Sequence, residues 1–164
     1  MKRLKVFYSQ PMDFLTKASI RQRLRTLRNR TKPLAVEIVA PYEDEKERDL
    51  HQNPMSRREA QDIVKKNLDA LGTSDMLVAN VSQENRQAIG MLFEIAHARF
   101  LNKFIVIYAG KSSIGKQLWI QAYANVICSS WNEVVDTIHQ RIQVRDLDRN
   151  GRTSVAAIAP DSAR

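Results

Sequence analysis

A glutamate follows a buried strand at a spacing that places it beside the edge of a sheet. Glu94 stands one helical turn after Gly90, in a helix that follows the apolar run 76–81. The carboxylate should lie near the N-terminal end of that helix, beside the strand's carboxyl end, where open α/β sheets bind ligands. A carboxylate there is a competent nucleophile toward a sugar carbon with oxocarbenium character, and the helix dipole would keep it ionised. A glutamate early in a helix is more often only a stabilising charge, and that alternative stays open.

The segment after the next strand nearly matches a phosphate-binding loop. Residues 110–117 read Gly-Lys-Ser-Ser-Ile-Gly-Lys-Gln, against the pattern GxxxxGK[ST]. Gln117 has no hydroxyl for Mg²⁺, and the strand 126–129 carries no aspartate to help hold the ion. We therefore do not expect ATP hydrolysis. Glu94 and His97 form a single Glu-x-x-His pair, and the 3 histidines show no ligand spacing, so no metal site is predicted.

Short apolar runs alternate with amphipathic stretches along the chain. Runs rich in β-branched residues predict five strands, at residues 4–8, 34–40, 76–81, 104–108 and 126–129. Helical spacing of apolar residues predicts helices at 17–30, 56–72, from about 88, at 117–124 and at 131–144. Ser56 and Glu59 form a capping box at the start of the second helix, and Gly72 ends it.

This alternation predicts a parallel sheet that is covered by helices on both faces. We expect a flavodoxin-like, doubly wound α/β fold with five strands in the order 2-1-3-4-5 and right-handed crossovers. The carboxyl ends of the first, third and fourth strands would then face a common ligand site. We expect one domain at residues 1–144 and a mobile C-terminal tail at 145–164, where the apolar period is lost.

The composition indicates a cytoplasmic protein. The hydrophobic share of 43% and the charged share of 27% are ordinary for a soluble domain, and we find neither a signal peptide nor an apolar run that could span a bilayer. The single cysteine, Cys128, lies in an apolar run and is expected to fill the core of a protein in a reducing compartment. Trp119 and Trp131 have apolar neighbours at helical spacing and are also expected to pack.

The net charge of +8 favours an anionic partner such as a nucleotide or a nucleic acid. Seven Lys or Arg lie between residues 17 and 32 with no acid among them, whereas 43–49 holds five acids. The basic run is more often a solvated helix face than a nucleic-acid-binding surface. Steeply salt-dependent binding to DNA would support the second interpretation.

Three segments carry a resemblance to a known family. They are the strand 75–81, the sequence Gly-x-x-Phe-Glu-Ile-Ala-x-Ala at 90–98, and Asn-Lys-Phe-Ile-Val-Ile at 102–107. Together they resemble the nucleoside 2-deoxyribosyltransferases and their relatives, the 2'-deoxynucleoside 5'-phosphate N-hydrolases. In that family the glutamate that matches Glu94 attacks the anomeric carbon of the deoxyribose and releases the base, and water or another base resolves the glycosyl ester. The resemblance implies no cofactor and a homodimer.

The resemblance also assigns roles to other positions. The transferase aspartate that binds the 5'-hydroxyl is Ala88 here, and the N-hydrolases have a small residue there that leaves room for a phosphate. A second family aspartate falls on Asn67, whose amide can hold a base but cannot transfer a proton. The family's first-strand tyrosine falls on Phe7. The sugar and phosphate would be held by Phe7, Ser9, Gln10, Pro11, Met12, Ala88, Gly90 and Ser113.

We therefore predict an N-glycosidase that hydrolyses the base–sugar bond of 2'-deoxynucleoside 5'-monophosphates. Glu94 would be the nucleophile and Asn67 the polar group that faces the base. Three alternatives remain: a base-exchanging transferase of the same fold, an NAD glycohydrolase, and a nucleotide-binding protein without turnover, which the altered Phe7 and Asn67 would allow. The turn at residues 9–12 could also be a plain strand-to-helix connection.

Overall fold

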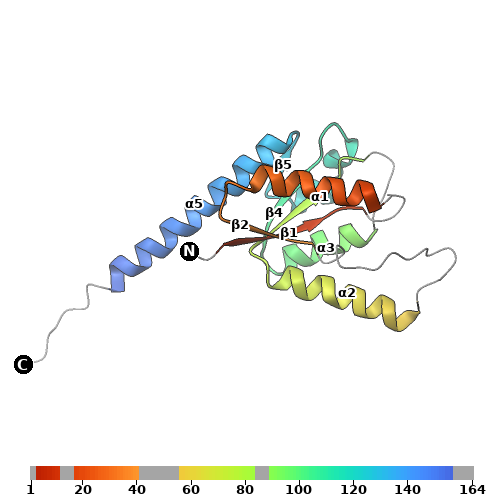
Figure 1. Cartoon of the computed structure of the whole chain (residues 1–164), viewed down its shortest axis with the longest axis horizontal. Coiled ribbons are helices and arrows are strands. Elements are labelled where there is room, and N and C mark those ends of the chain that lie inside the picture. Colours follow the sequence, from red (N-terminus) through yellow and green to blue (C-terminus); the bar gives the residue numbers. More distant parts are fainter. Residues whose placement is uncertain (1–2, 12–16, 41–55, 84–88, 157–164) are drawn as a thin grey trace, which may run out of the picture.

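The computed structural model describes residues 3–11, 17–40, 56–83 and 89–156, in which strands and helices alternate (Figure 1). The elements are β1 (Leu4–Ser9), α1 (Lys17–Thr31), β2 (Val36–Val39), α2 (Arg57–Gly72), β3 (Met76–Asn80), α3 (Ile89–Phe100), β4 (Phe104–Tyr108), a 3₁₀ helix η2 (Ser113–Lys116), α4 (Leu118–Tyr123), β5 (Val126–Cys128) and α5 (Trp131–Ala156). The predicted helices and strands are all present, with shifted ends. Met12 and Ala88 lie outside the described residues.

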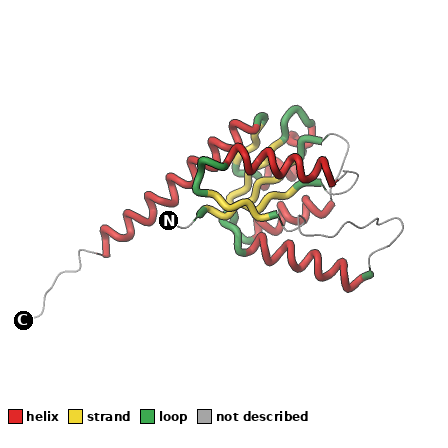
Figure 2. The backbone as a smooth tube through the Cα atoms, in the orientation of Figure 1, coloured by secondary structure: helices red, strands yellow, loops and turns green. Residues whose placement is uncertain are grey.

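The five strands form one parallel sheet in the order β2-β1-β3-β4-β5, which confirms the flavodoxin-like prediction. Figure 2 shows the strands gathered between the helices. All five residues of β3 are buried, as a central strand with helices on both sides requires. The sequence order of the strands changes direction between β1 and β3, and that reversal is the topological switch point of this fold.

Alternate residues of each strand pack against different helices. Phe7 of β1 belongs to the core under α2, α3 and α4, which also contains Leu71 and Ile95. Its neighbour Tyr8 belongs to the other core, under α1 and α5, with Leu24. Successive side chains of β1 therefore point alternately to the face covered by α3 and to the face covered by α1.

The predicted capping box at the start of α2 is confirmed. The hydroxyl of Ser56 accepts a hydrogen bond from the backbone N–H of Glu59, and the Glu59 carboxylate accepts one from the backbone N–H of Ser56. This reciprocal pair satisfies two backbone donors that the first turn would otherwise leave unpaired. Its effect is to fix where α2 begins, and α2 carries one of the candidate site residues.

The predicted end of the closing helix is wrong. We expected the helix to end at Val144, but α5 continues to Ala156, so the predicted domain boundary falls inside it. Figure 1 shows this part of α5 extending beyond the sheet, at the end where the strands begin. Val134, Ile138 and Ile142 bury one stripe of α5, and helix propagation beyond a packed turn needs no further burial. The loss of apolar period marks where packing ends and not where the helix ends.

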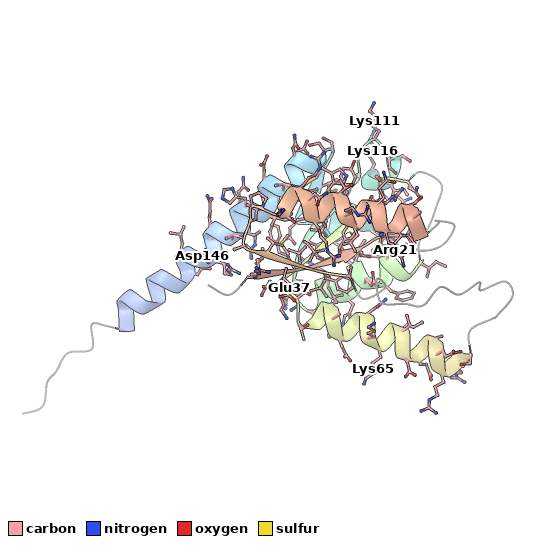
Figure 3. All side chains as sticks on the ribbon, in the orientation of Figure 1. Arg21, Glu37, Lys65, Lys111, Lys116 and Asp146 are labelled. Carbon is pink, nitrogen blue, oxygen red and sulfur yellow. The ribbon has the colours of Figure 1, made fainter. Side chains whose placement is uncertain are left out.

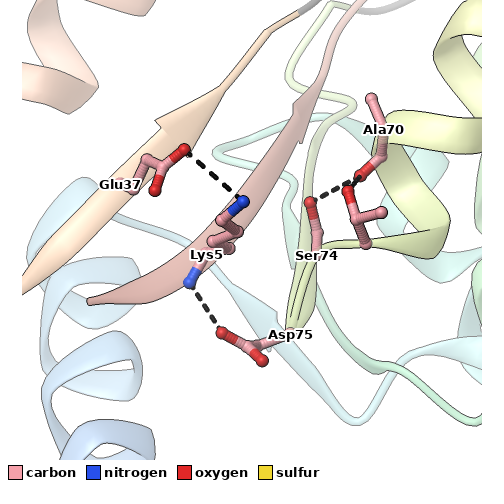
Figure 4. A network of polar contacts seen from close by, with 6 residues as sticks. Lys5, Glu37, Ala70, Ser74 and Asp75 are labelled. Atoms are coloured by element: carbon pink, nitrogen blue, oxygen red, sulfur yellow. Dashed lines mark hydrogen bonds and ion pairs between the residues drawn. The ribbon is translucent and has the colours of Figure 1, made fainter. Parts of the chain in front are cut away.

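Asp75, which opens the family-like segment, has a structural role. Its carboxylate accepts a hydrogen bond of 2.8 Å from the backbone N–H of Lys5, which ties the start of β3 to β1 (Figure 4). The ammonium of Lys5 lies 3.8 Å from the carboxylate of Glu37 on β2. These contacts fix the pairing of the three strands at the end of the sheet opposite to the switch-point loops.

Three smaller expectations have mixed outcomes. Cys128 is buried, as predicted. Trp131 packs on Tyr108 with 4.3 Å between ring centroids, but Trp119 is 67% exposed, so the packing prediction is wrong for Trp119. No helix among the described residues is long and apolar enough to cross a membrane.

We expect Ser56→Ala to lower the free energy of unfolding by about 1 kcal/mol, because the N-cap hydrogen bond of α2 is lost. Urea unfolding followed by circular dichroism measures this change. Lys65→Ala, an exposed substitution on the same helix, is the control and should change it by less than about 0.5 kcal/mol. Equal effects of the two substitutions would contradict the capping role.

Candidate active site

The carboxylate of Glu94 receives hydrogen bonds from two other elements. The hydroxyl of Ser9, the last residue of β1, donates to Oε2 at 2.5 Å. The amide Nδ2 of Asn67 on α2 donates to Oε1 at 3.3 Å. Three segments far apart in the sequence therefore converge on one half-buried carboxylate.

Packing explains why these three side chains meet. Met91, Ile95 and Ala98 are the buried residues of α3, and they hold the helix against the sheet. Ser9 faces α3 because it lies two residues after Phe7 in the strand alternation. Asn67 lies one helical turn before the fully buried Leu71 on α2, so its amide faces the core.

Burial raises the pKa of the Glu94 carboxyl above its ordinary value of 4.5, because loss of water disfavours the charged form. The hydrogen bonds from Ser9 and Asn67 act in the opposite direction without cancelling this effect. The raised pKa is opposite in direction to the lowering that the helix dipole was expected to cause. Since α3 begins at Ile89, Glu94 lies in the second turn, beyond the reach of the N-terminal partial charge. A carboxyl with a raised pKa is a common feature of active sites.

The other predicted site residues that the structure describes are dispersed. Phe7 is buried in the core under α3 and offers no polar group. Gln10 faces the other side of the sheet, where its Nε2 donates to the carbonyl of Ile20 at 3.2 Å. Gly90 and Ser113 are exposed, and Pro11 is buried. The structure thus brings Ser9, Asn67 and Glu94 together and not the whole predicted set.

Sequence reasoning missed a buried polar group on the α1 side of the sheet. The hydroxyl of Tyr8 accepts a hydrogen bond of 3.0 Å from Nδ2 of Asn80 and donates to Oε1 of Gln10 at 3.4 Å. The Oδ1 of Asn80 accepts from both the backbone N–H and the hydroxyl of Ser82. Burial raises the pKa of Tyr8 to about 12, so this phenol is protonated. The available signal was a polar residue, Asn80, at the end of a fully buried strand.

The segment 110–117, which nearly matches the phosphate-binding-loop pattern, contains the 3₁₀ helix η2. Ser112 is buried and its hydroxyl accepts from the backbone N–H of Ile114, so it caps η2. A Cβ at Gly115 would lie 2.7 Å from the Cβ of Ala109, so the turn packs tightly on the sheet. Among the residues that the structure describes, no group of three His, Cys, Asp or Glu could hold a metal ion.

One hollow on the described surface lies outside this cluster. It follows the outer face of α2 and does not include Glu94. Its lining residues are Arg57, Ala60, Gln61, Val64, Lys65, Leu68 and Asp69. The chemistry of the hydrogen-bonded cluster, and not the depth of a hollow, identifies the candidate site.

A family model matches the part of the chain that contains this cluster. The model describes the nucleoside 2-deoxyribosyltransferases and covers residues 9–124, which is well over half of the 164 residues. The chain belongs to the nucleoside 2-deoxyribosyltransferase family. The resemblance and the prediction of an enzyme are therefore confirmed. No curated protein matches the sequence.

Solved structures share the fold of this family member at low sequence identity. A 2-deoxyribosyltransferase from Bacillus psychrosaccharolyticus has a TM-score of 0.61 at 16% identity, over 80% of this chain and 90% of that protein. A conserved protein from Enterococcus faecalis V583 has a TM-score of 0.61 at 16% identity, over 85% and 99%. A CMP N-glycosidase from Clostridium botulinum has a TM-score of 0.50 at 16% identity, over 83% and 98%. These likenesses show the fold.

We expect Glu94→Gln to increase the stability of the protein at neutral pH. A carboxyl whose pKa is raised by folding contributes stability below its unfolded value of 4.5, and loses it as the pH rises through the raised pKa. The glutamine variant lacks this loss, so its advantage over the parent should shrink as the pH falls from the raised pKa toward 4.5, and it should be absent below 4.5. Thermal unfolding across this pH range measures the difference.

Glu133→Gln is the matched control, with the opposite sign. Hydrogen bonds from the backbone N–H and hydroxyl of Ser129 and from Ser130 lower the pKa of Glu133. Its ionised form therefore stabilises the protein at neutral pH, and the substitution should reduce stability there. A loss of stability at neutral pH in Glu94→Gln would show that desolvation does not dominate at Glu94.

Proposed function

We propose that this family member hydrolyses the N-glycosidic bond of 2'-deoxynucleoside 5'-monophosphates, with Glu94 as the nucleophile. The observation that carries the proposal is the half-buried carboxylate that Ser9 and Asn67 hold from two other elements. A fixed, partly desolvated carboxylate is positioned for covalent attack and loses little solvation when it reacts.

The reaction would proceed in two displacements. The carboxylate of Glu94 attacks C1' of the deoxyribose, the bond from C1' to the base nitrogen breaks, and the base departs with the bonding electron pair and takes a proton from solvent. Water then attacks C1' of the glycosyl ester, which releases deoxyribose 5-phosphate and restores the carboxylate. The amide of Asn67 holds Glu94 but cannot supply the proton.

Three observations favour a phosphorylated substrate over a free nucleoside. The family position that binds a 5'-hydroxyl is Ala88, which lies outside the described residues and carries no polar group. The net charge of +8 favours an anion. The fold is also shared with a CMP N-glycosidase, which acts on a nucleotide.

Base exchange is the second candidate, since the family's own description is that of a transferase. The glycosyl ester is common to both reactions, and the acceptor decides between them. The lack of a transferable proton on Asn67 weakens both equally. Adding a free base to the reaction separates them, because only a transferase incorporates it.

We also propose a homodimer that forms through an apolar surface of α3 and α4. Ile89, Phe93 and Phe100 lie along one stripe of α3 and are 64%, 70% and 81% exposed. Leu118 and Trp119 of the adjoining α4 are 77% and 67% exposed. Apolar groups gathered in this way usually mark a protein interface. The cytoplasmic location stays a prediction.

We expect release of free base from at least one deoxynucleoside monophosphate, and a fall of at least about a thousandfold in Glu94→Ala. Chromatography of reactions with each monophosphate, each nucleoside and NAD measures the release. Asp62→Ala, an exposed carboxylate on α2, is the control and should retain full activity.

Tight nucleotide binding without base release would favour the non-catalytic alternative. Release of nicotinamide from NAD, with none from the nucleotides, would favour the NAD glycohydrolase. Incorporation of an added base would select the transferase.

We expect the double substitution Phe93→Ser and Phe100→Ser to convert a dimer into a monomer in sedimentation equilibrium, because it removes the largest exposed apolar side chains of α3. Leu147→Ser is the control: it removes a similarly exposed apolar residue from the part of α5 that follows its buried stripe, and it should leave the dimer intact. A monomeric parent protein would refute the proposed interface.

A further inference from the structure

Arg23 differs from the other arginines of the basic helix α1. Arg21, Arg25, Arg28 and Arg30 are exposed, as expected for a solvated helix face, whereas Arg23 is half-buried. Its Nη1 is buried and has no hydrogen-bond partner. Among the described residues no carboxylate pairs with it. A guanidinium nitrogen removed from water without an acceptor is costly, and structures rarely retain one without a ligand or another purpose.

Arg23 lies on α1 between Ile20, whose carbonyl accepts a hydrogen bond from Gln10 directly after β1, and Leu24, which shares a core with Tyr8. Its guanidinium interacts electrostatically with the buried phenol of Tyr8, whose hydroxyl contacts Asn80 at the end of β3. Arg23 therefore approaches the switch point between β1 and β3 from the α1 side. Glu94 approaches the same two strand ends from the α3 side, through Ser9.

Exposed cations surround the same end of the molecule. Figure 3 places Arg21, Lys111 and Lys116 at the end where α1 and α3 begin. These side chains are solvated and mainly attract an anion from a distance. Arg23 is partly withdrawn from water, so a hydrogen bond from its guanidinium to an anion would be stronger and more directional.

We propose that Arg23 binds the 5'-phosphate of the substrate and thereby selects nucleotides over nucleosides. This proposal rests on the proposed function and adds the residue that recognises the phosphate. Because Arg23 is only half-buried, its planar guanidinium can donate to two phosphate oxygens at once from the side that is accessible. The sugar then spans the switch point, with C1' on the Glu94 side and the phosphate on the Arg23 side. The predicted phosphate-binding residues Ser9 and Gln10 are engaged with Glu94 and Ile20 instead.

Calorimetry with 2-deoxyribose 5-phosphate, inorganic phosphate and 2-deoxyribose tests Arg23 without any turnover. We expect Arg23→Gln to weaken binding of the two phosphate compounds by at least about tenfold, and to leave 2-deoxyribose unaffected. Arg25→Gln removes an exposed charge from the same helix and should change each affinity less than about twofold. Arg23→Lys should bind with intermediate affinity, because it keeps the charge but loses the planar fork.

Thermal unfolding controls for folding. Arg23→Gln removes a buried donor without a partner, so we expect it to be no less stable than the parent protein. If Arg23→Gln does not fold, the phosphate affinity of Arg23→Lys is compared with that of the parent protein instead. Equal phosphate affinity in the parent and in Arg23→Gln overturns the proposal, as does a parent protein that binds neither phosphate compound.

The two proposals fail separately. If no base is released from any substrate but Arg23→Gln still weakens phosphate binding, the glycosidase is wrong and the phosphate site stands. If base is released and the ratio of kcat/KM for nucleotide over nucleoside is unchanged in Arg23→Gln, the glycosidase stands and the role of Arg23 is wrong.

Discussion

The packing of α3 on the sheet takes the carboxylate of Glu94 partly out of water, and two hydrogen bonds from the surrounding elements offset part of that cost. Burial alone would make such a carboxyl a simple destabilising group, because an isolated charge loses more solvation than packing returns. The donors come from Ser9 and Asn67, on β1 and α2. The strand order and the capping of α2 set the positions of these two elements. They therefore affect the pKa of the Glu94 carboxyl. Catalysis by a buried carboxyl typically accepts a loss of stability of this kind.

The topology decides which residues can share a ligand with Glu94. The loops after β1 and β3 lead to helices on opposite faces of the sheet, because α1 packs with α5 whereas α3 packs with α2 and α4. The strand ends at this reversal are the common ligand site of open α/β sheets. Groups from both faces can therefore reach one small molecule, and a reaction centre on the α3 side can be combined with a charge on the α1 side.

Much of the fold was predictable from local pattern, and the site only in part. The alternation of apolar runs with amphipathic stretches predicted the strand order, and Ser56 with Glu59 predicted the start of α2. The pattern could not predict the end of α5, since a helix that no longer packs shows no apolar period. It also could not tell that Gln10 would turn toward Ile20, or that Ser9 would donate to Glu94, because these contacts depend on side-chain direction.

Asn67 and Arg23 lie on opposite sides of the sheet, and each has a buried polar atom without a partner among the described residues. The Oδ1 of Asn67 is an acceptor, since its Nδ2 must face the carboxylate of Glu94, whereas the Nη1 of Arg23 is a donor. Each unpaired atom destabilises the free protein, so a ligand that paired with both would gain affinity. Such a ligand carries an N–H or O–H group at one end and an anion at the other. A nucleotide has this arrangement, with donors on its sugar and base and acceptors on its phosphate, whereas a free nucleoside would leave Arg23 unpaired.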